Sequence, residues 1–304
     1  MLFKVTKGEA KKIVPEQYKL EKEIQSFVEE NLLELLNLEV VKSEFVIEQY
    51  RMDTLAFDKE NKSFIIIEYK RGSSYSVIDQ GYSYLSTLLN NKADIILEYN
   101  ERMNKSLKRD EVDWSQSRII FISQTFTQFQ RDSLNFKNLP IELYEIKKYD
   151  GDIVSFTPIK GKVNAESINT ISIQNEEIKK VSNEIKVYTV EEHYKNSTEE
   201  IVELYKMFVE RIENMIPDIT VEALKKYIAL KNNKKNLVDF TLQKNALKIW
   251  INTKKGSLND FKNIMKDVSN VGCYGNGDYE LSIKNDEDLE YILSMIKEAN
   301  NTII

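Results

Sequence analysis

The feature that most constrains this chain is a pair of neighbouring strands whose ends carry charged side chains. The segment Phe64–Ile67 is a continuous run of β-branched and aromatic residues, which is typical of a strand buried on both faces. Residues 52–57 predict a neighbouring strand, and residues 58–63 predict the hairpin turn between the two. The apolar run ends in the triplet Glu-Tyr-Lys at residues 68–70. Two charged side chains are therefore predicted at the point where a buried strand reaches the edge of the sheet.

These strand ends predict a cluster of two acids and one lysine. Side chains alternate along a strand, so Glu68 and Lys70 project to the same face, and antiparallel pairing brings Asp53 near both. Two converging carboxylates repel each other unless a hard cation lies between them, and Mg²⁺ or Mn²⁺ held by one or two carboxylates plus substrate phosphate is the usual arrangement. Lys70 can then orient an attacking water and stabilise charge on phosphoryl oxygens. The alternative is a solvated strand end at which acid and base simply pair.

Two helices are predicted to flank these strands. Residues 16–36 carry apolar side chains at helical spacing, and Glu21 lies at the margin of the apolar face, whereas Glu23 points further away. Residues 74–89 predict a second helix, in which Gln80 and Tyr84 are four apart and share one side. A further apolar strand follows at residues 118–123.

The resulting order of helix, three strands, helix and strand resembles the PD-(D/E)XK nuclease superfamily over about residues 15–125. The spacing of Asp53 from the triplet that holds Glu68 and Lys70 carries that resemblance, although Met52 stands where the name of the superfamily has proline. Glu21, together with the pair on the second helix, makes the chain most similar to NucS-like endonucleases. The resemblance implies an α/β fold with a restriction-endonuclease-like α-β-β-β-α-β core.

The same resemblance implies a role for each of these polar residues. It implies that Asp53 and Glu68 are the metal ligands, that Lys70 is the catalytic lysine, that Glu21 assists the metal or the water, and that Gln80 and Tyr84 form a supporting pair. It also implies Mg²⁺ or Mn²⁺ as cofactor and DNA as the partner.

Composition limits the other classes of function. The 304 residues are enough for two domains, and 41% hydrophobic with 30% charged residues is an ordinary composition for a soluble protein. No apolar run approaches the roughly 18 residues needed to cross a bilayer, so we expect no membrane association. One cysteine, Cys273, and one histidine, His193, support neither a disulfide framework nor a zinc site, and they favour a cytoplasmic location.

The net charge is unusual for a nucleic-acid-binding protein. A formal charge of −6 argues against a protein that simply coats nucleic acid, because such binding needs clustered lysine and arginine. Local patches can still contact phosphates, and Lys70 with Arg71 is one such candidate for DNA binding. Residues 102–109 form a second basic patch, for which a solvated helix end is the alternative.

The domain organisation is predicted from patterning. Residues 1–160 form the nuclease-like domain and close with a hairpin around an Asp-Gly turn at residues 150–151. The polar segment 161–186 is interpreted as a linker, and residues 187–304 as a smaller α+β domain. The elements expected in this domain are helices at 197–216, 258–265 and 286–299 and strands at 227–230, 237–242, 247–251 and 279–283.

This second domain resembles a family of small bacterial domains of unknown function that are often labelled "predicted transport protein". The resemblance rests on residues 236–240, 247–251 and 267–278. Lys248, Trp250 and Asn252 fall on one strand face and could form a ligand or nucleic-acid surface; the alternative is that Trp250 packs under the adjoining helix.

Taken together, the sequence favours a metal-dependent endonuclease that hydrolyses DNA phosphodiester bonds, a Mg²⁺- or Mn²⁺-dependent deoxyribonuclease. One alternative is a non-catalytic nucleic-acid-binding or regulatory protein that retains the nuclease fold. A more distant one is a soluble component of a transport system. The sequence also allows a homodimer and does not decide the oligomeric state.

Overall fold

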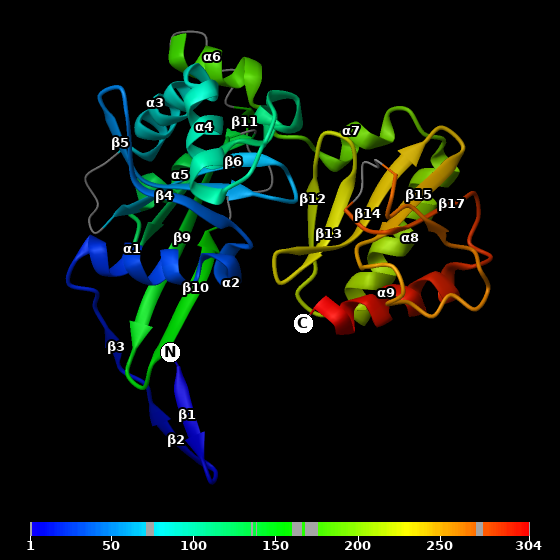
Figure 1. Cartoon of the computed structure of the whole chain (residues 1–304). Helices are drawn as coiled ribbons and strands as arrows, with labels where there is room; N and C mark the ends of the chain where they lie inside the picture. The colour runs from blue at the N-terminus through cyan, green and yellow to red at the C-terminus, as the bar shows by residue number, and fades with distance from the viewer. Residues whose placement is uncertain are drawn as a thin grey trace. The chain divides into compact units, whose positions relative to one another are not determined.

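The computed structural model describes residues 2–70, 76–134, 136–137, 139–159, 166–167, 176–271 and 276–303. The chain divides into two compact units, Met1–Val187 and Tyr188–Ile304 (Figure 1). Each unit has its own hydrophobic core. Arg71, which was a candidate DNA contact, lies outside the described residues, as do Cys273 and the glycines at 272 and 275.

The first unit is built on a mixed sheet in the order β10-β9-β7-β6-β5-β4, with the short strand β3 paired to β9. The β6–β7 and β7–β9 pairs are parallel, and the other neighbours are antiparallel. The strands are β3 (Pro15–Glu16), β4 (Glu39–Ile47), β5 (Tyr50–Asp58), β6 (Ser63–Lys70), β7 (Arg118–Ser123), β9 (Ile141–Tyr149) and β10 (Ile153–Ile159).

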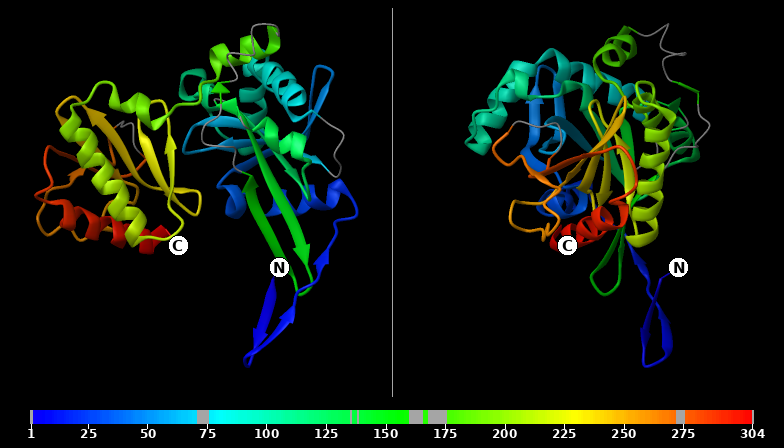
Figure 2. Two further views of the ribbon diagram at one scale, coloured as in Figure 1. Left: turned by 180° about the vertical axis from the view of Figure 1, so that it is seen from behind. Right: turned by 90° about the vertical axis from the view of Figure 1, so that its right-hand side faces the viewer.

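Helices cover both faces of this sheet (Figures 1 and 2). The helices are α1 (Glu21–Glu30), α2 (Leu32–Leu36), α3 (Val77–Asn90), α4 (Lys92–Met103), α5 (Gln128–Ser133) and α6 (Glu176–Glu184), with 3-10 turns at Arg109–Glu111 and Trp114–Gln116. Strand β6 explains why two layers form: Ile65 and Ile67 belong to the core under α1, and Phe64 and Ile66 belong to the core under α3 and α4. The predicted α-β-β-β-α-β order is confirmed as α1, β4, β5, β6, α3 and β7.

Two small sheets stand apart from the main one. Strands β1 (Phe3–Thr6) and β2 (Glu9–Lys12) form an antiparallel pair at the N-terminus, which the sequence did not predict. Strands β8 (Phe136–Lys137) and β11 (Glu166–Ser167) form a short parallel pair.

The interpretation of residues 161–186 as a linker was wrong for their C-terminal part. Residues 176–184 form helix α6, which packs against α3, and Ile178, Val181 and Ile185 are buried in the core of the first unit. The spacing of these three residues by three and four is a helical period with one apolar face, and it is strong enough to fix an otherwise polar segment. Most of residues 161–175 lie outside the described part of the chain.

The second unit is a six-stranded antiparallel sheet in the order β12-β13-β14-β15-β17-β16, with α8 and α9 packed on its apolar core. Its elements are α7 (Val190–Tyr194), α8 (Glu199–Met215), β12 (Thr220–Ala223), β13 (Ile228–Asn232), β14 (Lys235–Gln243), β15 (Ala246–Ile251), β16 (Lys266–Asp267), β17 (Tyr279–Ile283) and α9 (Leu289–Ile303). None of the described helices combines the length and the apolar composition needed to cross a bilayer.

The helix expected at residues 258–265 does not form. Asp260 explains the difference, because its carboxylate accepts hydrogen bonds from the backbone N–H of Met265 at 2.8 Å and from the Tyr291 hydroxyl at 2.8 Å. Asn263 has a φ of 53°, which interrupts a right-handed helix. Aspartate and asparagine side chains thus satisfy the backbone of this loop in place of a helical ladder.

Trp250 is buried, at 1% exposure, and is not a surface residue. Its indole N–H donates to Glu280 Oε2 at 2.9 Å, and the Lys248 ammonium lies 5.2 Å from the centre of its ring. The tryptophan is not part of the apolar cluster under α8 and α9, so it packs on the opposite face of the sheet from those helices.

Candidate active site

The candidate site lies where strands β5 and β6 stop pairing. Their ladder ends at the pair Thr54 and Ile67, and beyond that point side chains replace the backbone bonds. The Asp53 N–H donates to Glu68 Oε1 at 3.0 Å, and the Tyr69 N–H donates to Asp53 Oδ2 at 2.9 Å. Each carboxylate therefore accepts a hydrogen bond from the backbone of the opposite strand, and the two acids lie side by side as the sequence predicted.

Lys70 joins this pair of acids on the same face of β6. Its ammonium donates to Glu68 Oε2 at 3.2 Å, and the side chain is 13% exposed. Burial acts to lower the pKa of Lys70, but the adjacent Glu68 carboxylate raises it, and the net shift is upward. The lysine is therefore held in its charged form beside the acids.

Burial and mutual repulsion disfavour negative charge on both acids. Glu68 is 2% exposed, and burial, followed by the nearby Asp53 carboxylate, raises its pKa to about 7. Burial also raises the pKa of Asp53, although the hydrogen bond from the Tyr69 N–H opposes that shift. One lysine is thus not enough to compensate the buried Glu68 and the half-buried Asp53, and a further cation at this position would lower both pKa values.

Helix α3 contributes the predicted amide and phenol. Gln80 Nε2 lies 3.4 Å from Glu68 Oε2 and donates to the Tyr84 hydroxyl at 3.2 Å. The Tyr84 hydroxyl donates in turn to the backbone oxygen of Arg51 at 3.2 Å. The two residues therefore connect Glu68 on β6 to the backbone of β5. Ser76 caps the helix by accepting from the Asp79 N–H at 3.3 Å.

The structure separates Glu21 from Glu23. Glu21 is the first residue of α1, is exposed, and its charge raises the pKa of Asp53, which places it close enough to act on that carboxylate. Glu23 instead accepts from the backbone N–H of Lys19 at 2.7 Å and so stabilises the start of the helix. Of the two glutamates, Glu21 is the one that acts on the site.

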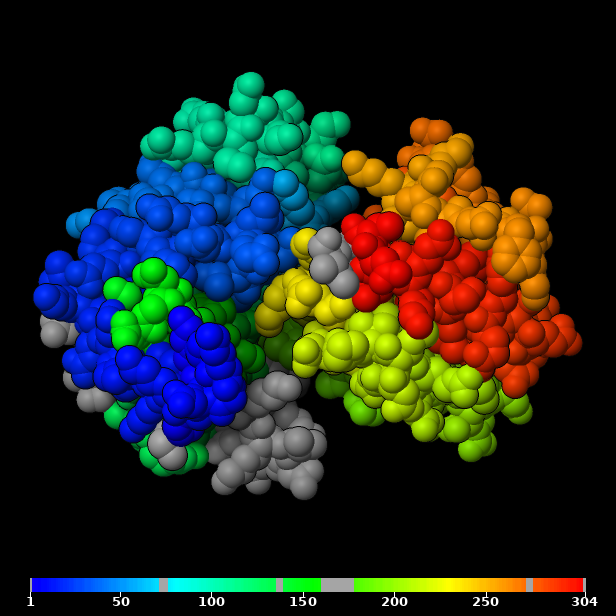
Figure 3. Space-filling view, turned by 90° about the horizontal axis from the view of Figure 1, so that it is seen from below, coloured from blue at the N-terminus to red at the C-terminus, as the bar shows by residue number. Residues whose placement is uncertain are grey.

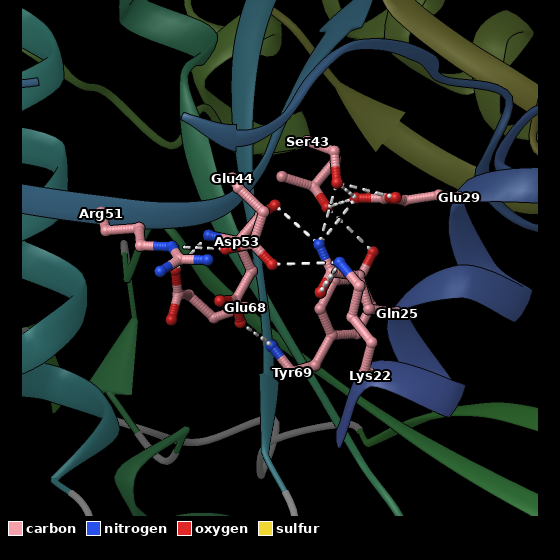
Figure 4. A network of polar contacts seen from close by, with 10 residues as sticks. Lys22, Gln25, Glu29, Ser43, Glu44, Arg51, Asp53, Glu68 and Tyr69 are labelled. Carbon is pink, nitrogen blue, oxygen red and sulfur yellow. Dashed lines mark hydrogen bonds and ion pairs between the residues drawn. The ribbon is translucent and has the colours of Figure 1, made fainter. Parts of the chain in front are cut away.

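A second layer of polar contacts supports Asp53 from α1 (Figure 4). Gln25 is only 4% exposed, and its amide donates to the Asp53 backbone oxygen at 3.0 Å and to Ser43 Oγ at 3.1 Å. Glu29 accepts from the Thr54 hydroxyl at 2.5 Å, and the Thr54 and Tyr69 hydroxyls lie 3.2 Å apart. These contacts hold the backbone of β5 against α1.

Sequence reasoning missed Gln25. The available signal is that Gln25 lies one residue after Ile24 and three before Val28, so it falls within the apolar stripe of the helix, where a polar side chain is informative.

A neighbouring ion-pair group was also missed: Glu44 pairs with Lys22 at 3.1 Å and with Arg51 at 2.5 Å. Burial raises the pKa of Glu44, but hydrogen bonds from these two cations lower it, and the net shift is downward.

The site is suited to a hard cation held by few protein ligands. Carboxylate oxygens are the ligands that Mg²⁺ and Mn²⁺ prefer, and Mg²⁺ usually keeps several waters and is held by one or two carboxylates together with substrate phosphate. Within the described residues there is no group of three or more histidine, cysteine, aspartate or glutamate side chains that could ligate a metal. Asp53 and Glu68 therefore fit a site completed by water and phosphate, not an all-protein cage.

Comparison with known proteins gives one relative along almost the whole chain. A protein of Haemophilus influenzae described as "Uncharacterized protein" is 46% identical over 298 residues, which are 98% of this chain and 98% of that one. Residues 190–302 match the family model described as a domain of unknown function, DUF5655.

Solved structures match the chain more weakly, as the identity and coverage of two of them show. The crystal structure of a repair endonuclease from Pyrococcus abyssi has 14% identity and a TM-score of 0.25, over 43% of this chain and 48% of that one. The structure of Pyrococcus furiosus SfsA in complex with Ca²⁺ has 15% identity and a TM-score of 0.25, over 47% of this chain and 63% of that one. This chain thus spans less than two thirds of either structure.

Proposed function

The chain belongs to the same family as the relative from Haemophilus influenzae, and we propose that it is a metal-dependent endonuclease that hydrolyses DNA phosphodiester bonds. The observation that carries the proposal is the convergence of Asp53, Glu68 and Lys70 at the end of the β5–β6 ladder. A buried and a half-buried acid that lie side by side with raised pKa values form a good site for a divalent cation.

Each residue of the site has a role in this proposal. Asp53 and Glu68 would hold Mg²⁺ or Mn²⁺, and the cation would supply a Lewis acid that lowers the pKa of water and polarises a phosphoryl oxygen. Lys70, whose pKa is raised, would remain charged while it orients the attacking water and stabilises the developing charge. Gln80 would keep the Glu68 carboxylate in place through its contact at 3.4 Å, and Tyr84 would keep Gln80 in place.

Glu21 would act on the reaction through charge. Its position at the start of α1, where its charge acts on Asp53, lets it assist the water or a cation. The Lys70 ammonium lies 3.2 Å from Glu68 Oε2, and so Lys70 is the first candidate to contact a phosphate.

One observation favours a protein that binds nucleic acid without cutting it. The Lys70 ammonium is already paired with the Glu68 carboxylate at 3.2 Å. A protein that retains the two acids only because they stabilise the fold would show the same contacts between Asp53, Glu68 and Lys70. Metal binding and cleavage must therefore be measured separately.

The test is Mn²⁺ calorimetry beside a cleavage assay on single-stranded, duplex and branched DNA. Asp53→Asn keeps an acceptor for the Tyr69 N–H but removes a charged ligand, so it should abolish both Mn²⁺ binding and cutting. Lys70→Ala keeps both carboxylates, so it should retain Mn²⁺ binding while the rate falls about 100-fold to 1000-fold. Glu101→Gln, an exposed acid on α4, is the matched control and should change neither.

Two results would contradict the proposal. If the wild type binds Mn²⁺ and DNA but cuts none of the three substrates, the protein is a binder that retains the fold. If the wild type binds no divalent cation, the nuclease assignment is wrong.

A further inference from the structure

The first ten or so residues form a separate two-stranded ribbon, which we call the N-terminal ribbon (residues 2–12). Strands β1 and β2 pair in antiparallel fashion through a turn at Lys7 and Gly8, whose φ angles are 52° and 87°. Two positive φ angles in a two-residue turn match the twist of the flanking strands, so the hairpin is well formed. Both strands extend away from the main sheet, and all eight of their residues are exposed (Figures 1 and 2).

The ribbon is strongly basic within an acidic chain. It contains four lysines, at positions 4, 7, 11 and 12, and one acid, Glu9, whereas the whole chain has a formal charge of −6. This is a local concentration of positive charge of the kind that contacts phosphates.

The pairing of the strands places two of these lysines against each other. Lys4 lies directly opposite Lys11, so the two side chains share one face of the ribbon, which also carries Thr6 paired with Glu9. Like charges at directly opposed positions destabilise a strand pair, and a two-stranded ribbon is already marginal in water. An anion between or beside the two lysines would relieve this repulsion. Glu9 lies beside Lys11 and offsets only one of the two charges, so this face keeps a net positive charge that favours a polyanionic partner.

The base of the ribbon is fixed to the first unit. The Ile13 N–H donates to the Leu2 backbone oxygen at 3.0 Å, and the Asp150 N–H donates to the Val14 backbone oxygen at 2.9 Å. Strand β3 then pairs with β9. Figure 3 shows the N-terminal residues, in blue, beside the turn of the β9–β10 hairpin, in green.

The chain just after the ribbon is also tied to the edge of the sheet that carries the candidate site. Gln124 binds the backbone of Tyr18 twice, at 2.9 Å to its N–H and at 3.1 Å to its oxygen. Gln124 directly follows Ser123, the β7 residue that is paired with Lys70 on β6. The ribbon is thus anchored to the strand next to the proposed catalytic lysine.

We propose that the N-terminal ribbon is a DNA-contacting arm whose Lys4 and Lys11 bind the phosphate backbone of duplex DNA. The choice of DNA as the polyanion rests on the proposed function. A two-stranded ribbon is of a size that the major groove, about 12 Å wide, admits, and its lysine face then meets the phosphates that flank the groove. The opposite face carries Lys12 and Ala10 with Phe3 and Val5, and the last two are 51% and 67% exposed and can make apolar contacts within the groove.

The test is DNA binding by the full chain carrying the double substitution Lys4→Gln and Lys11→Gln. Fluorescence anisotropy with a labelled duplex is measured in EDTA between 50 and 200 mM salt, conditions in which divalent-dependent cutting does not occur. Each phosphate contact that is lost makes the negative slope of log affinity against log salt shallower by about 0.9. The slope of the double variant should therefore be shallower than that of the wild type by about 2, and the variant should bind more weakly at every salt concentration. Lys179→Gln with Lys225→Gln removes two exposed lysines elsewhere and should leave the slope unchanged.

Folding and metal binding distinguish this proposal from the proposed function. Removing the opposed charges should leave the melting temperature of the double variant equal to or above that of the wild type, and its Mn²⁺ affinity should not change. If the double variant loses DNA affinity while the wild type binds no Mn²⁺, the ribbon binds DNA and the nuclease assignment fails. If the wild type cuts DNA but the double variant keeps the wild-type salt slope, the ribbon proposal fails.

A second pair of substitutions tests a different occupant of the same ribbon. Phe3→Ser with Val5→Ser removes the exposed apolar side chains and keeps every lysine. If the wild type is a dimer, this variant is a monomer by light scattering, and the lysine variant binds DNA as the wild type does, the ribbon is an interface between copies of the chain and the DNA proposal is overturned. Failure of the wild type to bind duplex DNA at all would overturn it equally.

Discussion

The pKa of Glu68 leads to a specific prediction about how the stability of the metal-free protein depends on pH. Burial, and then the nearby Asp53 carboxylate, raise the pKa of Glu68 from 4.5 to about 7. The folded state therefore binds the proton more tightly than the unfolded state does. The stability that this group contributes is fully present below pH 4.5 and is lost as the pH rises through about 7. A shift of this size corresponds to about 3 kcal/mol, and Glu68 is 2% exposed, so solvent screening does not reduce it much.

The perturbation that isolates this effect is Glu68→Gln. Glutamine keeps a side-chain oxygen that accepts from the Asp53 N–H, and it cannot become charged. In EDTA, the variant and the wild type should have similar free energies of unfolding near pH 4.5, and the variant should be more stable by up to about 3 kcal/mol near pH 8.5. Under the proposed function, added Mg²⁺ should stabilise the wild type at pH 8.5 and leave the variant nearly unaffected, because only the wild type keeps both carboxylates.

The assay is urea unfolding followed by the fluorescence of Trp114. The chain has two tryptophans, and Trp114 stacks on Phe64 in the first unit with ring centres 5.4 Å apart. Trp250→Phe is therefore introduced throughout, so that the signal reports the unit that holds Glu68. Glu98→Gln is the control, because hydrogen bonds from Lys42 and Arg102 lower the pKa of Glu98 despite its partial burial, and its effect should have the opposite sign with pH. A difference between wild type and Glu68→Gln that does not vary with pH would refute the reasoning.

Two further substitutions test the support of the site and the packing of the second unit. Gln25→Leu leaves the Asp53 backbone oxygen and Ser43 without a buried donor, so it should destabilise the protein by about 1–3 kcal/mol and weaken Mn²⁺ binding in calorimetry. Val28→Ala, on the same helix, should cost similar stability without weakening Mn²⁺ binding, and equal Mn²⁺ affinities in the two variants would contradict the role of Gln25. Gly277→Ala should destabilise the second unit by about 3 kcal/mol or more, because an added Cβ would lie 2.0 Å from the Ile251 backbone oxygen. This substitution is measured with one tryptophan at a time. Unfolding followed by Trp250 in a Trp114→Phe background should shift, and unfolding followed by Trp114 in the Trp250→Phe background should stay the same. An unchanged Trp250 transition would contradict the predicted clash with Ile251.

The centre of the candidate site could be predicted from the sequence because it depends on short-range periodicity. The alternation along β6 puts Glu68 and Lys70 on one face, and the spacing of four on α3 puts Gln80 beside Tyr84. Such relations hold wherever a strand or helix forms. Distances across elements, such as that from Asp53 to Glu68, follow only after the pairing of the strands is known.

The features that the sequence did not reveal depend on contacts between distant segments. Gln25 acquires its role from the backbone of Asp53, which is 28 positions away. Helix α6 is held by α3, and its polar composition hides three buried side chains. In residues 258–265, the contact of Asp260 with Tyr291 outweighs the helical pattern. The N-terminal ribbon has too few apolar residues for its strands to be recognised by burial.

The crossed hydrogen bonds at the end of the β5–β6 ladder link the chemistry of the site to the integrity of the sheet. Asp53 and Glu68 each satisfy a backbone N–H that the ladder itself leaves open. A substitution that removes either oxygen acceptor leaves a donor without a partner in a largely buried position, which costs about 1–3 kcal/mol whether or not the protein turns over a substrate. Selection for folding alone is then sufficient to keep both acids in a descendant that no longer cuts. Under the proposed function, Lys70 is therefore a better indicator of activity than the two acids, because its ammonium bonds to a side chain and closes no part of the strand ladder.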